Sequence, residues 1–159
     1  MGGAPAEAVR TTRRVRRPKD KEKLLTRLVD EKVFETYRDA LAFAAALGYS
    51  KNTREAFDQT SEPIAWSVFS GAGHEALVNL ISVVHTNDFD ILGAERFDER
   101  LVIFEEYANG GLRILEELLG RADRQSLDVV LDMVMEAEAP PTETGGAVEI
   151  EKFARDLSW

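Results

Sequence analysis

The chain has 159 residues and a formal net charge of −9 at pH 7, with 44% hydrophobic and 31% charged residues, the usual range for one globular domain with polar ends. It contains no cysteine, which excludes disulfides, thiolate metal sites and a cysteine nucleophile. No apolar run approaches the ~20 residues that a membrane span needs, and the N-terminus lacks the apolar centre of a secretory signal. We therefore expect a cytoplasmic protein with a single compact core and no membrane partner.

The charge is divided unevenly along the chain. Residues 10–27 hold nine cations and two anions, a charge of +7, so the other 141 residues together carry −16. An acidic body repels phosphates over a Debye length of ~10 Å, so any contact with DNA has to be made by the basic segment. The candidate DNA-binding residues are Arg13, Arg14, Arg16, Arg17, Lys19 and Lys21. The alternative is that this segment folds back onto the acidic body or binds an acidic protein surface.

The fold class expected from the sequence is mainly α, a single compact multi-helix domain. Residues 1–18 are expected to form a basic, largely disordered arm, 19–138 the helical domain, and 139–159 a flexible linker with a short C-terminal helix. That last segment can dock on its own domain or on a partner through spaced apolar residues. They are Val148, Ile150, Phe153 and Leu157.

Two helices are predicted at the start of the domain. Asp20 is placed to cap a helix over about residues 20–30, in which apolar residues recur at three- and four-residue spacing. The next helix, residues 34–47, has apolar residues on nearly every side, which places it in the centre of the core. Gly48 is a natural C-terminal cap for it.

A loop and a second group of elements follow in the middle of the chain. Polar residues without a period extend to Ser61, and the alternation of Ile64, Trp66 and Val68 indicates one short strand or hairpin near 62–70. A helix is then expected from about His74 to Thr86. Its apolar side is formed by Leu77, Leu80, Ile81 and Val84.

The longest helical pattern runs from Ala94 to Leu119. Its predicted buried side consists of Phe97, Leu101, Phe104, Tyr107, Ala108, Leu112, Leu115 and Leu119. Gly110 and Gly111 interrupt it, and two glycines cost a helix interior about 2 kcal/mol relative to alanine. They predict either a helix break or a place where another backbone comes close. A last core helix, from about 124 to 137, is expected to bury Leu127, Val130, Leu131 and Val134.

No set of residues in the sequence predicts catalysis, a metal or a cofactor. His74 and His85 are eleven residues apart and fit the start and the end of a helix, where they have structural roles. Asp30-Glu31-Lys32 matches the acid–x–Lys element of one nuclease class, but it falls in a charged turn without a second acid on a preceding strand. We therefore expect a protein that is not an enzyme.

The basic segment also allows a ribbon-helix-helix arrangement, in which a strand precedes two helices and pairs with a second copy to enter the major groove. Val9, Thr11, Arg13 and Val15 alternate with more polar residues, and the two predicted helices follow. The strand would be basic on both faces, so an irregular basic arm is the preferred interpretation. A homo-oligomer stays open.

Three motifs in order resemble the Dnd-system-associated protein 4 family over about residues 15–120. They are FETYRDALAFAAALG at 34–48, Glu62-Pro63-Ile64 with Trp66 and Phe69, and FEEYANGGL at 104–112. The resemblance implies a small protein encoded beside genes for DNA phosphorothioation and the restriction that depends on it. It assigns no catalytic residue, and the part of the chain after Pro140 lies outside it.

The resemblance leads to two functional hypotheses. The first is a non-enzymatic accessory or regulatory subunit in phosphorothioation-linked restriction and anti-phage defence, which contacts DNA through the basic arm and a larger restriction or modification protein through its body. The second is a protein–protein adaptor without direct DNA contact, whose arm binds an acidic protein surface.

Overall fold

The computed structural model describes residue 10 and residues 12–139. Six α-helices make up most of this part of the chain, which confirms the mainly α fold class. In chain order they are α2 (Glu22–Asp30), α3 (Tyr37–Ser50), α4 (Trp66–Gly71), α5 (Glu75–Thr86), α6 (Phe97–Arg121) and α7 (Ser126–Glu138). Three short 3-10 helices are η1 (Lys19–Lys21), η2 (Phe89–Leu92) and η3 (Ala94–Arg96). The segment 148–159, for which a short helix was predicted, lies outside the described residues.

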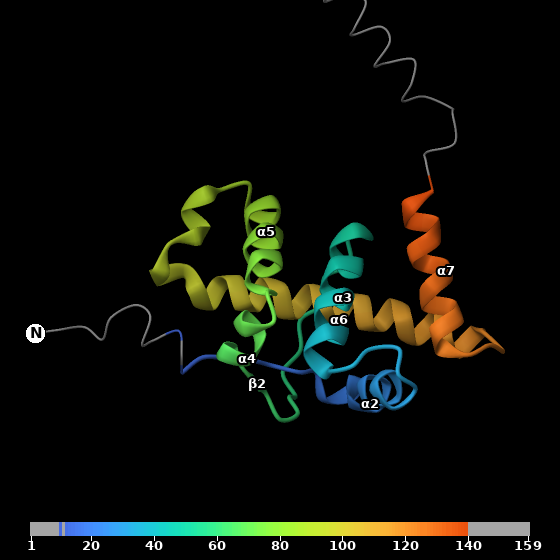
Figure 1. The fold of residues 1–159 in the computed structure, drawn as a ribbon. Helices are drawn as coiled ribbons and strands as arrows, with labels where there is room; N and C mark the ends of the chain where they lie inside the picture. The colour runs from blue at the N-terminus through green and yellow to red at the C-terminus, as the bar shows by residue number, and fades with distance from the viewer. Residues whose placement is uncertain (1–9, 11, 140–159) are drawn as a thin grey trace, which may run out of the picture.

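The long helix α6 organises the fold. In Figure 1, α5 and α7 stand on one side of α6, α2 and α4 lie on the other side, and α3 crosses α6 between α5 and α7. The main contact is between α3 and α6. All eight residues predicted for the buried side of α6 are buried, because one apolar stripe at three- and four-residue spacing runs through the whole helix. None of the described helices is long and apolar enough to cross a membrane.

The crossing of α3 and α6 is so close that it requires glycine. A Cβ atom at Gly111 would overlap the backbone of Ala44, and one at Gly110 would overlap the carbonyl of Thr53. The helix α6 runs through both glycines without a break, which confirms the close approach and excludes the predicted alternative of a helix break. Gly48 was predicted to cap α3 at its C-terminus, but it lies inside the helix. A Cβ atom at this position would overlap the carbonyl of Tyr107.

Two short strands join the N-terminal segment to the middle of the chain. The strand β1 (Arg14–Val15) pairs antiparallel with β2 (Ile64–Ala65), with Arg14 opposite Ala65 and Val15 opposite Ile64. The short strand expected near 62–70 is therefore present, although α4 begins at the residue that follows it. A ribbon-helix-helix protein pairs this strand with a second copy. Here β1 pairs with a strand of its own chain.

Packed structure begins earlier than residue 19, where the sequence placed the start of the domain. Val15 is fully buried, Pro18 forms a bridge with Thr60, and Arg17 is buried as well. The cap also differs from prediction: Asp20 lies inside η1, and α2 starts after Lys21 without a side-chain cap. The short 3-10 turn already directs the chain into α2, which makes a cap by Asp20 unnecessary.

The buried sides of α5 and α7 differ from the predicted ones. On α5, Ile81 is buried as expected, whereas Leu80 and Val84 are exposed. On α7, Val130 is buried as expected together with Val129. The remaining predicted core residues of α7, namely Leu127, Leu131 and Val134, are exposed. Both helices carry apolar residues on more than one side, so periodicity alone does not identify the side that contacts the core.

Candidate functional site

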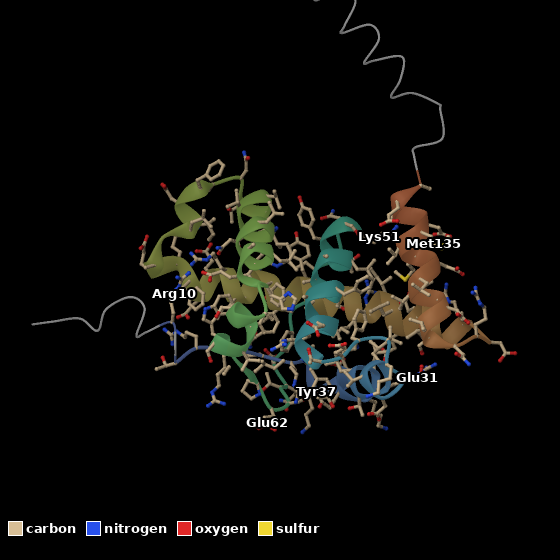
Figure 2. The ribbon with its side chains drawn as sticks, in the orientation of Figure 1. Arg10, Glu31, Tyr37, Lys51, Glu62 and Met135 are labelled. Atoms are coloured by element: carbon tan, nitrogen blue, oxygen red, sulfur yellow. The ribbon has the colours of Figure 1, made fainter. Side chains whose placement is uncertain are left out.

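Most cations of the basic segment form ion pairs with the acidic body. Arg10, labelled in Figure 2, pairs with Glu75 at 2.9 Å. Arg13 Nε lies 2.7 Å from Asp98 on α6. Lys21 Nζ lies 2.8 Å from Asp20 and 3.3 Å from Glu116. The segment is thus held along the body by opposite charges, as one of the sequence alternatives proposed.

Arg17 is the most deeply integrated of the candidate DNA-binding residues. Its Nε donates to the backbone carbonyl of Glu62 at 2.6 Å, and its Nη2 lies 3.3 Å from a carboxylate oxygen of Glu22. The guanidinium also lies 4.5 Å from the ring centre of Tyr37, a cation–π contact. Figure 2 labels Tyr37 and Glu62 near each other at the lower edge of the molecule. Through these three contacts, Arg17 joins the N-terminal segment to α2, to α3 and to the residue Glu62.

Arg16 meets a buried acid. Glu105 on α6 is 3% exposed and accepts two hydrogen bonds from Arg16, from Nε at 2.6 Å and from the backbone N–H at 3.1 Å. Burial raises the pKa of Glu105 to about 7, although Arg16 acts in the opposite direction. The Arg16 guanidinium also lies 4.9 Å from the ring centre of Phe57. This pair fixes the segment and the 51–61 loop onto α6.

Two of the six candidate DNA-binding residues have free side chains. Arg14 and Lys19 are exposed and form no ion pair with any described residue. Lys23, in the first turn of α2, is exposed and unpaired in the same way. These three cations, close together in the sequence, are the ones in residues 10–27 that have no ion-pair partner among the described residues.

The two histidines have structural partners. His74 Nε2 lies 3.0 Å from Asp39, and His85 Nδ1 lies 2.8 Å from the hydroxyl of Tyr107. Burial and the neighbouring Arg54 lower the pKa of His85. Among the described residues, no group of three or more His, Asp or Glu side chains is arranged to hold a metal ion. His74 and His85 thus lie at the start and near the end of α5, the helix positions predicted for them.

Helix α7 presents apolar side chains to solvent. Leu127, Leu131 and Met135 follow one another at four-residue spacing and form what we call the outer face of α7. Leu131 is 49% exposed and Met135, labelled in Figure 2, is 67% exposed. Side chains of this size usually lie against another surface when they follow one side of a helix. The outer face thus leaves three large apolar side chains of one described helix in contact with solvent.

The other side of α7 borders a groove of about 1100 Å³ between α3, α6 and α7. Its apolar lining comes from all three helices. The residues are Phe43 and Leu47 of α3, Ile114 and Leu118 of α6, and Val129 and Met133 of α7. Charged residues surround it, among them Lys51, which Figure 2 labels near the end of α3. We call this feature the α3–α6–α7 groove.

Sequence reasoning missed both the outer face and the groove. It assigned Leu127, Val130, Leu131 and Val134 to the core because they fit a helical stripe, but the structure buries only Val130 of these four. A usable signal was present, since Val129 and Met133 mark a second apolar side of the same helix. A short helix with two apolar sides can bury only one of them on its own domain.

These features define a small helical protein with an acidic body, a basic segment packed against it, and an apolar helix face turned to solvent. The chain belongs to the family described as DNA sulphur modification system-associated protein 4, whose model matches residues 14–153. This confirms the family seen in the sequence motifs and links the chain to a DNA sulphur modification system. The match extends well beyond residue 120, where the motif-based resemblance ended, and includes residues 140–153, so the expectation that the chain after Pro140 lies outside the family was wrong for that part. Comparisons with curated proteins and with solved structures gave no match.

Proposed function

We propose that this protein is a non-catalytic accessory subunit that binds another protein of the DNA sulphur modification system through the outer face of α7. The observation that supports this proposal is the exposure of Leu127, Leu131 and Met135 on one side of a single helix. Anchors at intervals of four residues are the pattern with which a helix enters an apolar groove of a partner.

The charges on α7 define the chemistry of the partner. Alongside the apolar anchors, α7 carries only acidic charged residues. They are Asp128, Asp132, Glu136 and Glu138, of which the last three also border the α3–α6–α7 groove. An apolar groove with a basic rim would therefore complement this helix, since opposite charges at the rim of an interface steer association and select the partner.

Direct DNA contact is the second candidate function. Arg14, Lys19 and Lys23 support it because they are exposed and unpaired among the described residues. The ion pairs of Arg13, Arg16, Arg17 and Lys21 favour the adaptor role, because a cation that already faces a carboxylate must break that pair before it can neutralise a phosphate. A partner that itself binds DNA would bring this basic segment close to the duplex.

The test is co-purification with each protein of the same modification system. We expect one of them to form a stable complex with the intact chain. The double variant that carries Leu131→Asp and Met135→Asp should abolish this complex. Leu80→Asp on α5 is the matched control, since Leu80 is also exposed. The proposal is contradicted if no complex forms, or if the control abolishes the complex and the α7 variant does not. A metal- or nucleotide-dependent activity of the purified chain on DNA would overturn its non-catalytic part.

A further inference from the structure

We propose that the α3–α6–α7 groove is the docking site for the C-terminal segment of the same chain, residues 148–159. The groove is an apolar channel at the end of the described domain, and the segment is the next apolar stretch of the sequence.

Part of the apolar lining of the groove is open to solvent. Helix α7 packs on α6, and the groove lies between α7 and α3. In its lining, Leu47 and Val129 are each 9% exposed and belong to the core, whereas Phe43 and Met133 are only partly buried. Leu118, on the floor formed by α6, is 36% exposed. Filling such a channel with apolar side chains removes the lining from water, which is favourable in proportion to the apolar area covered.

The chain leaves the described domain at the groove itself. Ala137 and Glu138, at the end of α7, both line it. Residues 140–147 can span at most about 26–29 Å when extended. The thirteen residues of α7 measure about 20 Å along the helix axis. The linker is therefore long enough to bring residues 148–159 back to any point along the groove.

The composition of the segment fits the groove. Val148, Ile150, Phe153 and Leu157 supply apolar side chains of the kind that line it. The groove lining carries both kinds of charge, with cations at Lys51, Arg121 and Arg124 and acids at Glu117, Asp132, Glu136 and Glu138. The segment carries both as well, with acids at Glu149, Glu151 and Asp156 and cations at Lys152 and Arg155. Its acids can face Lys51 and Arg121, which are exposed and unpaired among the described residues, and its cations can face the acids of α7. The family model also includes the chain through residue 153, so the first half of the segment belongs to the family's own sequence.

This inference is independent of the proposed function. It concerns the groove side of α7, whereas the proposed partner binds the outer face. Docking of the C-terminal segment would hold α7 beside α3, and thereby present Leu127, Leu131 and Met135 in a fixed orientation. Either proposal can fail while the other stands, because their tests use residues on different sides of α7.

The test measures the distance between the groove and the segment in the full chain. Because the protein has no cysteine, Ala46→Cys at the groove and Ala154→Cys in the segment can be labelled with nitroxides without competition. We expect a narrow population of short distances that persists when labelled chains are diluted with unlabelled ones. A broad distribution without this population would overturn the proposal. Loss of the short distance on dilution would assign the groove to a second copy, which also overturns it.

Two variants distinguish docking from chance proximity. Leu118→Lys places a charge in the groove and should remove the short-distance population. Leu127→Lys, on the outer face of the neighbouring helix, is the matched control and should preserve it. Phe153→Ser alters the segment without changing any residue of the described core, so the same loss is expected in a domain that stays folded. A short-distance population unaffected by both Leu118→Lys and Phe153→Ser would contradict the proposal.

Discussion

Gly111 of α6 lies directly against the backbone of Ala44 in α3, and the space between them is too small for a methyl group. Ala44 and Ala45 are fully buried on the facing side of α3. Small residues on both helices thus allow the two backbones to touch along the main packing contact of the fold. The conformational cost of Gly110 and Gly111 in a helix interior is offset by this contact.

Gly111→Ala should therefore destabilise the protein, even though alanine is the better helix former. The gain in helix propensity is about 1 kcal/mol. Overpacking against a backbone costs about 1–3 kcal/mol and can exceed this range, so a net loss is expected. Urea denaturation measures it. Gly120→Ala, in the same helix but with open space around the new Cβ, is the control and should keep or raise stability. Unchanged or higher stability of Gly111→Ala would refute this account of the crossing.

The fold was predictable where one physical signal dominated. In the 25-residue helix α6, a single apolar stripe identified all eight predicted core positions correctly. The paired glycines predicted either a helix break or a close contact, and the structure shows the close contact. The apolar pattern predicted that Leu80 and Leu131 are buried, whereas the structure exposes both side chains. Each lies on a helix with more than one apolar side, and the choice between sides depends on neighbours that are distant in the sequence.

The role of the basic segment was open for a related reason. Local composition shows that residues 10–27 are basic, but it does not show which acids they meet. Arg16 and Glu105 are 89 residues apart in the sequence and 2.6 Å apart in the structure. Val15, between Arg14 and Arg16, looked like part of a solvated arm because its neighbours are charged. Its burial depends on pairing with β2, a contact that no local pattern reveals.

Arg16→Ala should reduce stability more than Arg14→Ala. The first removes a hydrogen-bonding partner from the buried carboxylate of Glu105, at a cost of about 1–3 kcal/mol. The second removes an exposed side chain that is unpaired among the described residues, and surface changes of this kind stay within about 0.5 kcal/mol. Urea denaturation at pH 8 compares them, because Glu105 is mainly ionised there. Equal effects of the two substitutions would show that the Arg16–Glu105 contact does not contribute to the free energy of unfolding.

Glu105 should make stability fall as pH rises between about 4.5 and about 7. Its pKa is raised from 4.5 to about 7 in the folded protein, so the native state holds a proton that the unfolded chain has released. The difference between the two pKa values of Glu105 corresponds to at most about 3 kcal/mol in the free energy of unfolding. The lowered pKa of His85 has the opposite effect in part of this range, because stability is lost there as pH falls.

The free energy of unfolding of the unsubstituted protein, the parent, is therefore compared with that of Glu105→Gln at each pH. The free energy of unfolding of the parent minus that of the variant should decrease from pH 5 to pH 7 and then level off. A difference that is constant across this range would show that Glu105 titrates near its usual pKa.

Binding to DNA, if the free cations mediate it, should depend only moderately on salt. Each neutralised phosphate of B-DNA releases about 0.9 counterion, so three contacts by Arg14, Lys19 and Lys23 predict a logarithmic slope of about −2.7. Replacing all three with glutamine should abolish this affinity. The control replaces Lys32, Lys51 and Arg121 with glutamine, which changes the net charge by the same amount. These three side chains are also exposed and unpaired among the described residues, and the control should retain the affinity for DNA. Equal losses in both variants would mean that net charge alone controls binding. A slope of about −3.6 or steeper would mean that cations now paired with the body release their carboxylates to meet phosphates.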